Sequence, residues 1–162
     1  MNQTKTPKSS GRKPAVITDR TELLDFLWSA QKEHGSIRFE DIEAASDALG
    51  ISTIDIQGVV TFNHYLTLQP RGQFTIYLNN SPVAESKGFE RMKKAFALAT
   101  GTPINVVDPS GQFGLFDNAC IGLSDMEPAA LINFHPFTNL NSLKIRDIVA
   151  QLKQGVDPAE IC

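Results

Sequence analysis

The sequence changes its hydrophobic period at Phe74-Thr-Ile-Tyr-Leu78, where Phe74, Ile76 and Leu78 alternate with Thr75 and Tyr77. A period of two is typical of a β-strand that buries one face. Before this stretch, apolar residues recur every three or four positions, which is the period of an amphipathic helix. The chain therefore divides near residue 73 into a helical part and a part that contains strands. This division indicates the α/β (α+β) class.

Three helices are expected before the break, and residues that favour helix ends bound them. Asp19, with Glu22 three residues later, predicts a capping box at the start of the first helix. Ser52 is the predicted N-cap of the third helix. Glycines at positions 35 and 50 close the first and second helices. The first two helices are expected at 19–34 and 39–49, and the third begins at Ser52 and continues at least to Phe62, before Pro70-Arg71-Gly72 ends the helical pattern. We expect residues 19–70 to form a small helical bundle.

After the break, short strands and two helices are expected. Apolar residues at helical spacing, Phe89, Met92 and Phe96 and later Ile145 and Val149, predict these two helices. A strand–helix–strands–helix order predicts helices packed on a small mixed sheet. The expected strands are 74–78, 112–116 and 129–133, with a further one at 134–137, and the expected helices are 89–99 and 141–154. Residues 73–155 would form this domain, and residues 156–162 a C-terminal tail.

Charge is distributed unevenly along the 162 residues, whose formal net charge is −3. Residues 1–18 carry Lys5, Lys8, Arg12 and Lys13 and no acid, so this stretch has a charge of +4. The remainder holds 11 basic and 18 acidic residues, a net charge of −7. Residues 1–18 are expected to be a disordered basic tail. The acidic body argues against nucleic acid as a partner.

The sequence lacks the motifs that are typical of several functional classes. The sequence has no G-x-G-x-x-G after a strand, no phosphate-binding Gly-Lys-Ser/Thr loop, no C-x-x-C pair and no G-x-S-x-G elbow. His34, His64 and His135 lie in three separate segments, without the spacing of a zinc pair. The chain has only two cysteines and no apolar run long enough to span a membrane. We expect a cytoplasmic protein without a disulfide scaffold or an all-cysteine metal site.

The segment 116–128 is unusual because Cys120, Gly122 and Ser124 recur at every second position. Apolar residues next to Cys120 predict that it is buried as a small packing residue. Met126 and Glu127 follow the glycine turn, so we expect them to point outward. These two residues are the candidate contacts with a partner protein.

Two phrases resemble the thioredoxin-like [2Fe–2S] ferredoxin family, whose members accompany a flavin subunit in complex I and in NAD-linked hydrogenases and formate dehydrogenases. Gly58-Val-Val-Thr-Phe62, followed by Leu68-Gln-Pro-Arg-Gly72, is similar to the family's third helix and the approach to its first strand. Ala119-Cys-Ile-Gly122, followed by Pro128, is similar to its second cluster loop. The resemblance implies a thioredoxin-like domain after the helical bundle.

The family holds its cluster with C-x4-C after the first strand and C-x3-C in the later loop. Carried over by position, the four ligands fall on Asn79, Ala84, Cys120 and Ser124. Only one of these is a cysteine, whereas a [2Fe–2S] cluster requires four ligand positions that are normally thiolates. The resemblance therefore implies a degenerate module for which no [2Fe–2S] cluster or other metal is expected.

Further stretches resemble one branch of the family, the N-terminal domain of the diaphorase subunit of soluble NAD-reducing hydrogenases. They are Ile76-Tyr-Leu-Asn-Asn-Ser81, Gly114-Leu-Phe-Asp117, Cys120–Asp125 and Ile148–Gly155. This resemblance implies an accessory subunit or domain, not catalytic alone, with FMN and NAD carried by a flavin- and NAD-binding partner. The alternative is an electron-transfer subunit that still holds a [2Fe–2S] cluster through non-standard ligands. A binding module for a small ligand is a third hypothesis.

Overall fold

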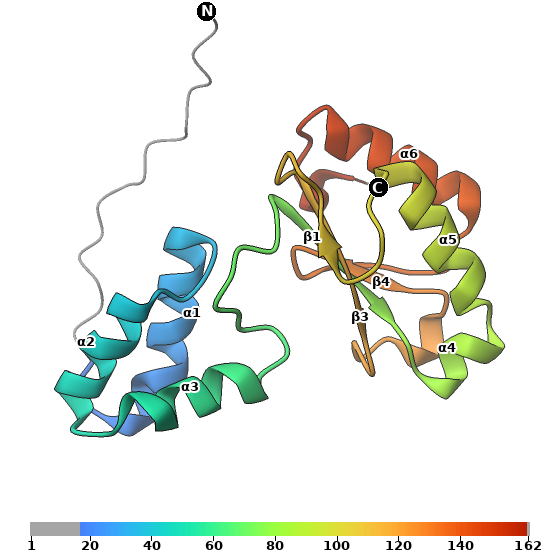
Figure 1. Ribbon diagram of the computed structural model, residues 1–162. Coiled ribbons are helices and arrows are strands. Elements are labelled where there is room, and N and C mark those ends of the chain that lie inside the picture. The colour runs from blue at the N-terminus through green and yellow to red at the C-terminus, as the bar shows by residue number, and fades with distance from the viewer. Residues whose placement is uncertain (1–16, 162) are drawn as a thin grey trace, which may run out of the picture. The chain divides into compact units, whose positions relative to one another are not determined.

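The computed structural model describes residues 17–161 as two compact units, of which the first ends at Pro70 and the second begins at Arg71 (Figure 1). The expectation for residues 1–16 lies outside this part of the chain, as does Cys162. Within residues 17–161, no helix is both long and apolar enough to cross a membrane.

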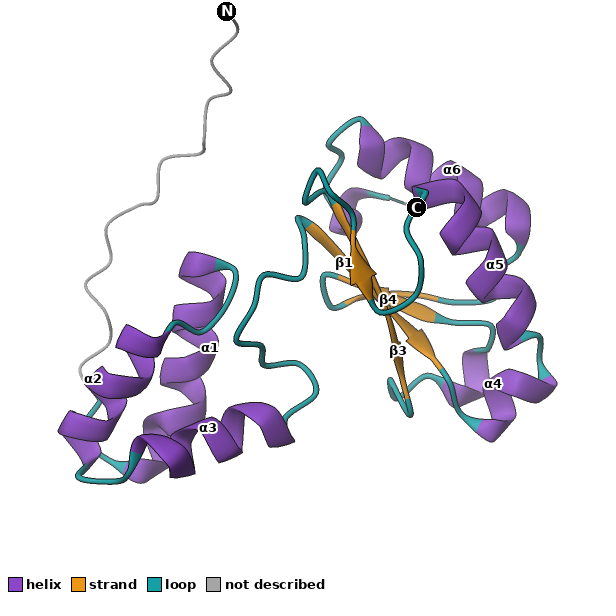
Figure 2. Cartoon of the chain, in the orientation of Figure 1, coloured by secondary structure: helices purple, strands orange, loops and turns teal. Residues whose placement is uncertain are grey.

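The first unit consists of helices packed around one apolar cluster (Figure 2). Asp19 caps the first turn by accepting from the Thr21 N–H at 2.8 Å, and Glu22 completes the predicted capping box. Ser52 Oγ accepts from the Asp55 N–H at 3.2 Å and caps the third helix as predicted. The elements are η1 (Arg20–Glu22), α1 (Leu23–His34), α2 (Phe39–Leu49) and α3 (Thr53–Phe62). The third helix ends at Phe62, the last residue of its predicted apolar pattern.

Two residues assigned to the basic tail belong to this unit. The Ile17 side chain is 6% exposed and joins the helical core. The Thr18 N–H donates to Glu22 Oε2 at 2.9 Å. The packed part of the chain therefore begins before residue 19, because an apolar residue next to a helix start can close the end of the core.

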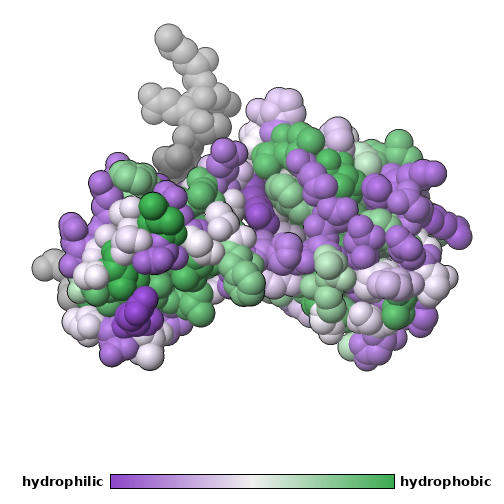
Figure 3. Space-filling model, turned by 60° about the horizontal axis from the view of Figure 1, so that its bottom comes forward, coloured by the Kyte–Doolittle hydropathy of each residue, from purple (hydrophilic) through white to green (hydrophobic). Residues whose placement is uncertain are grey.

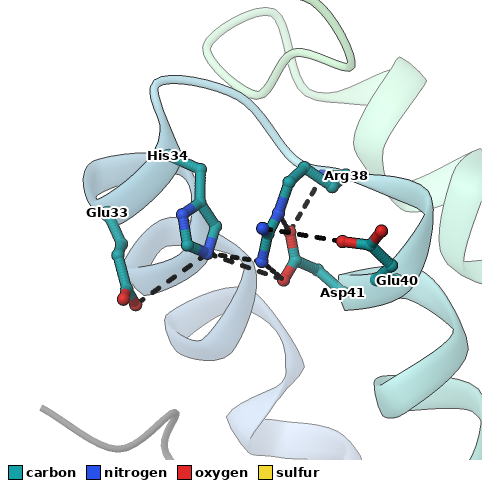
Figure 4. Close-up of polar contacts among 5 residues, drawn as sticks. All are labelled: Glu33, His34, Arg38, Glu40 and Asp41. Carbon is teal, nitrogen blue, oxygen red and sulfur yellow. Dashed lines mark hydrogen bonds and ion pairs between the residues drawn. The ribbon is translucent and has the colours of Figure 1, made fainter. Parts of the chain in front are cut away.

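A polar cluster joins the end of α1 to the start of α2 (Figure 4). Arg38 Nη2 lies 3.1 Å from Asp41 Oδ1 and 2.6 Å from His34 Nε2. Burial alone would raise the pKa of Asp41, but hydrogen bonds from the Arg38 side chain and backbone outweigh it and hold this pKa below its ordinary value. His34 therefore contacts an arginine, in addition to standing at a helix C-terminus as the sequence indicates.

Apolar side chains also reach the surface of the first unit, seen as green atoms in Figure 3. Ile54 is 76% exposed and Phe62 is 89% exposed, and both lie on α3. They are eight residues apart, which places them on one face of the helix. This face does not contribute to the core of the unit.

The second unit is a five-stranded mixed sheet in the order β2-β3-β1-β4-β5, with helices on one face (Figure 2). The central strand β1 (Phe74–Asn79) runs parallel to β3 (Phe113–Asn118) and antiparallel to β4 (Ala130–Ile132). The other elements are α4 (Pro82–Ser86), α5 (Phe89–Thr100), β2 (Val106–Val107), η2 (Ser124–Met126), β5 (His135–Phe137), α6 (Ser142–Lys153) and η3 (Pro158–Glu160). This α/β arrangement agrees with the predicted fold class.

The alternation seen in the sequence builds the core of the second unit. Phe74, Ile76 and Leu78 are at most 4% exposed and face the helices. Residues from α5 and α6 complete the same cluster. Ile161, in the segment expected to be a tail, is 5% exposed and packs into this core as well.

Candidate functional site

The four positions carried over from the cluster family lie after the carboxyl ends of two parallel strands. Asn79 is the last residue of β1 and pairs in register with Asn118, the last residue of β3. The loop that follows β3 contains Cys120 and Ser124. Because β1 and β3 are parallel, their carboxyl ends meet at one edge of the sheet. The sequence positions for a cluster are therefore gathered from this edge and from α4.

Asn79 is fully buried and forms the centre of a polar cluster. Its Nδ2 donates to Glu127 Oε1 and lies 3.5 Å from Ser124 Oγ. Glu127 Oε2 accepts from the backbone N–H of Ala129 at 2.8 Å. The side-chain amide of Asn79, at the end of β1, thus holds the loop that follows β3 in place.

The outward orientation predicted for Glu127 is wrong, because this side chain is only 5% exposed. It turns inward since two N–H donors, from Asn79 and from the Ala129 backbone, bind its carboxylate there. Met126, the other candidate contact residue, is 43% exposed. Sequence reasoning missed the role of Glu127, whose partner lies 48 residues earlier. A carboxylate next to Pro128, Ala129 and Ala130 was the one local signal that could have pointed to burial.

The predicted burial of Cys120 is also wrong, because the residue is exposed. Its neighbour Ile121 is 7% exposed and takes the inward position instead. The Gly122 N–H donates to Cys120 Sγ at 3.4 Å, within the same turn. Consecutive residues in an extended loop point to opposite sides, so an apolar neighbour favours burial of one of the two and not of both.

Ala84 lies in α4 and is 1% exposed, and its methyl group belongs to the core of the second unit. Its backbone N–H donates at 3.2 Å to Ser81 Oγ, which caps the helix. The position therefore offers no side-chain donor to a metal. The structure brings Asn79, Ser124 and Glu127 together, whereas neither Ala84 nor Cys120 has a side-chain hydrogen bond to them.

These residues do not fit a [2Fe–2S] cluster. Iron–sulfide centres require anionic, soft donors, and the buried Asn79 carboxamide is neutral. Its Nδ2 is already used by Glu127, and its Oδ1 has no hydrogen-bond partner among the described residues. Across residues 17–161, no group of three or more His, Cys, Asp or Glu side chains is placed to hold a metal ion. His135 packs edge-on against Phe137 and His34 contacts Arg38.

The family model described as "Thioredoxin-like [2Fe-2S] ferredoxin" matches residues 10–153. The chain belongs to this family. The match covers the helical unit and nearly all of the sheet unit, so it agrees with the resemblance found in the sequence and with the thioredoxin-like fold. Three of the four positions carried over from the resemblance, Asn79, Ala84 and Ser124, are not cysteines in this member of the family.

Similar proteins are subunits of NAD-linked enzymes. The chain is 45% identical over 144 residues to the NAD-reducing hydrogenase HoxS subunit alpha of Cupriavidus necator, covering 89% of this chain and 24% of that protein. It is 26% identical over 134 residues to an NADH-quinone oxidoreductase subunit of Escherichia coli, covering 83% of this chain and 81% of that protein. The chain thus spans about a quarter of the length of the first relative.

A solved structure gives the same fold. The crystal structure of an NAD+-reducing [NiFe]-hydrogenase in the air-oxidized state matches with a TM-score of 0.76 at 19% identity. The match covers 93% of this chain and 25% of that chain. At this identity the likeness supports the fold of the family member, with its helical unit and its thioredoxin-like unit.

Proposed function

We propose that this chain is a non-catalytic accessory subunit or domain of a cytoplasmic NAD(H)-linked oxidoreductase. It would dock on a flavin- and NAD-binding subunit, which carries the FMN and the NAD, and it would hold no [2Fe–2S] cluster itself. The similarity to subunits of a NAD-reducing hydrogenase and of NADH-quinone oxidoreductase supports this class of complex. The proposed subunit has the two domains expected at residues 19–70 and 73–155, with Ile17 added to the core of the first and Ile161 to the core of the second.

The observation that carries the proposal is the buried contact between Asn79 and Glu127. A family position that would hold iron through a thiolate is instead filled by an amide that fastens a carboxylate. The second position of the same pair is the core methyl group of Ala84. Two neighbouring ligand positions are therefore used for packing and hydrogen bonding, which supports a structural role over electron transfer.

Two exposed apolar features support docking on a partner. The loop 123–128 presents Met126, which is 43% exposed, beside a glycine turn. In the helical unit, Ile54 and Phe62 expose an apolar face of α3. Apolar side chains gathered on one exposed face are typical of protein interfaces, and the α3 face has this arrangement.

Metal analysis of the anaerobically purified protein tests the missing cluster. We expect the wild type to be colourless and free of iron and sulfide, before and after reconstitution. The matched variant is Asn79→Cys/Ala84→Cys/Ser124→Cys, which restores a cysteine at each family position. We expect this variant to gain visible absorbance on reconstitution. Stoichiometric iron and sulfide in the wild type would refute the proposal, as would turnover of NADH with a dye acceptor by the isolated chain.

Co-expression with the flavin-binding subunit of the same enzyme tests the docking. Met126→Asp should reduce copurification because it places a charge on an apolar contact. Val106→Asp is the matched control, since Val106 is 44% exposed on an edge strand outside the proposed contacts. If both variants copurify like the wild type, the loop 123–128 is not the interface.

The alternative of an electron carrier has one observation in its favour. Cys120 is exposed, so its sulfur is open to a ligand or to a partner-supplied donor. A cluster bridging the chain and its partner would appear only in the complex. Iron content of the copurified complex, compared between wild type and Cys120→Ser, separates this alternative from the structural role.

A further inference from the structure

A groove runs between the outer faces of α5 and α6 in the second unit, and none of the four cluster-family positions lines it. Its volume is about 670 Å³. Six residues of α5 and two of α6 line it, namely Glu90, Arg91, Lys94, Ala95, Leu98, Ala99, Ser142 and Arg146. The two helices pack against each other, so the groove lies on a preformed surface.

The α5 sequence carries two separate stripes. Phe89, Met92 and Phe96 face the core and are at most 3% exposed. The groove residues at positions 91, 94, 95, 98 and 99 follow the same helical spacing on another face. Leu98 on this second stripe is 85% exposed, which the fold of the unit itself does not require. The apolar part of the groove lining therefore comes from Leu98, Ala95 and Ala99.

The charges around the groove are mostly unpaired. Glu90, its single acid, lies 3.2 Å from Lys93 and is already engaged by it. Among the described residues, the side chains of Arg91, Lys94 and Arg146 have no ion pair or hydrogen bond. Three cations thus surround an apolar centre on a chain whose formal net charge is −3. A binding partner that supplied carboxylates around an apolar side chain would complement this groove in both respects.

We propose that the α5–α6 groove binds an acidic amphipathic helical segment of a partner protein. An apolar anchor of that segment packs on Leu98, Ala95 and Ala99, and its carboxylates meet Arg91, Lys94 and Arg146. Grooves between helices accept amphipathic helices in this manner. This surface is independent of the loop 123–128, so the inference extends beyond the proposed function.

Charge also decides against the other occupants. Residues 1–18 of this chain carry a charge of +4 and no acid, so the three cations would repel them. A second copy docked through the same groove would bring like charges together. Nucleic acid is disfavoured because residues 71–162 hold nine acidic and eight basic residues, and the groove supplies only three cations.

Fluorescence anisotropy with a labelled amphipathic peptide of leucine, alanine and glutamate tests the proposal on the full chain. The reference peptides replace every glutamate by lysine, or keep the composition in a scrambled order. We expect saturable binding of the acidic helix alone, weakened by added salt. The groove variant Arg91→Glu/Lys94→Glu/Arg146→Glu should lower the affinity about tenfold or more, because it reverses each of the complementary charges. Leu98→Ser should weaken binding as well.

The control variant Arg20→Glu/Lys32→Glu/Lys87→Glu makes the same change in net charge at exposed positions elsewhere. Circular dichroism shows whether both variants fold. Equal binding by the groove and control variants would overturn the proposal, as would equal binding of the scrambled peptide. A dimer abolished by the groove variant would assign the groove to a second copy. Preferential binding of phosphatidylglycerol vesicles would assign it to a membrane surface.

Discussion

The hydrogen bond between Asn79 and Glu127 should show a large energetic coupling, which a double-mutant cycle measures. The perturbations are Asn79→Ala, Glu127→Ala and the two together. Asn79 is fully buried and Glu127 is 5% exposed, so solvent cannot replace the lost partner. A buried hydrogen bond to a charged group contributes about 1.5–3 kcal/mol. Glu127→Ala also leaves the Ala129 N–H without its acceptor, which costs about 1–3 kcal/mol more.

We therefore expect Asn79→Ala to lower the free energy of unfolding by about 1.5–3 kcal/mol and Glu127→Ala to lower it by about 2.5–6 kcal/mol, because Glu127→Ala also removes the acceptor of the Ala129 N–H. The double variant should cost less than the sum by about 1.5–3 kcal/mol, because the second substitution removes a group that is already unpartnered. Urea unfolding followed by far-UV circular dichroism measures these differences. If the dependence of the unfolding free energy on urea concentration is the same in all variants, their stabilities can be compared directly.

Asn118→Ala provides the matched control. Asn118 is 5% exposed and lies beside Asn79 in register, but its side chain has no hydrogen bond to Glu127. Its substitution should add to Glu127→Ala without coupling. If the stability losses of Asn79→Ala and Glu127→Ala add to that of the double variant within about 0.5 kcal/mol, the contact between these two side chains does not hold the loop in place.

Three further outcomes are expected. Asp41→Asn should make the free energy of unfolding fall less steeply as the pH is lowered into the acid range. The pKa of Asp41 is held below its ordinary value of 3.8, so the stability that it contributes with Arg38 is present above about pH 4. That contribution is lost as the pH falls through the lowered pKa. Urea midpoints measured between neutral pH and about pH 3 test this. The prediction is contradicted if the midpoints of the wild type and of Asp41→Asn fall equally steeply with pH. Cys120 should react with a maleimide in the folded protein at a rate near that of a free thiol, which mass spectrometry of the labelled site records; protection until unfolding would contradict its exposure. Gly114→Ala should destabilise the protein by about 3 kcal/mol or more, because a Cβ there would lie 1.9 Å from the Arg71 carbonyl oxygen. Gly58→Ala, whose Cβ would stand in open space on α3, should stabilise the protein by about 0.5–1 kcal/mol. Thermal melts measure both differences.

The local patterns in the sequence were sufficient for most of the fold. Alternation at Phe74-Thr-Ile-Tyr-Leu78 predicted β1, and the helical spacing from Phe89 predicted α5. The sequence analysis did not predict α4, although Ser81 and Pro82 are a recognisable N-cap and first helical residue. It also did not predict β2, whose two valines are too few to show a period.

The orientation of loop residues could not be predicted in the same way. Glu127 was expected outward and Cys120 inward, and the structure reverses both. Burial of a carboxylate depends on a donor that the local sequence does not reveal, and here that donor comes from β1. Local periodicity carries no information about a partner this distant, so the candidate site was less predictable than the elements that hold it.

Contacts within the second unit link the end of β1 to the loop after β3. A cluster at the four family positions would link the end of β1 to the loop after β3. Here Asn79 and Glu127 make that link, and two backbone bonds hold the loop to its far side: Asn139 N–H to Met126 O at 3.0 Å and Leu140 N–H to Pro128 O at 2.8 Å. Since the unit also has one continuous apolar core across sheet and helices, these bonds have only to fix a loop. Under the proposed structural role, these bonds keep the loop in place for a partner to bind.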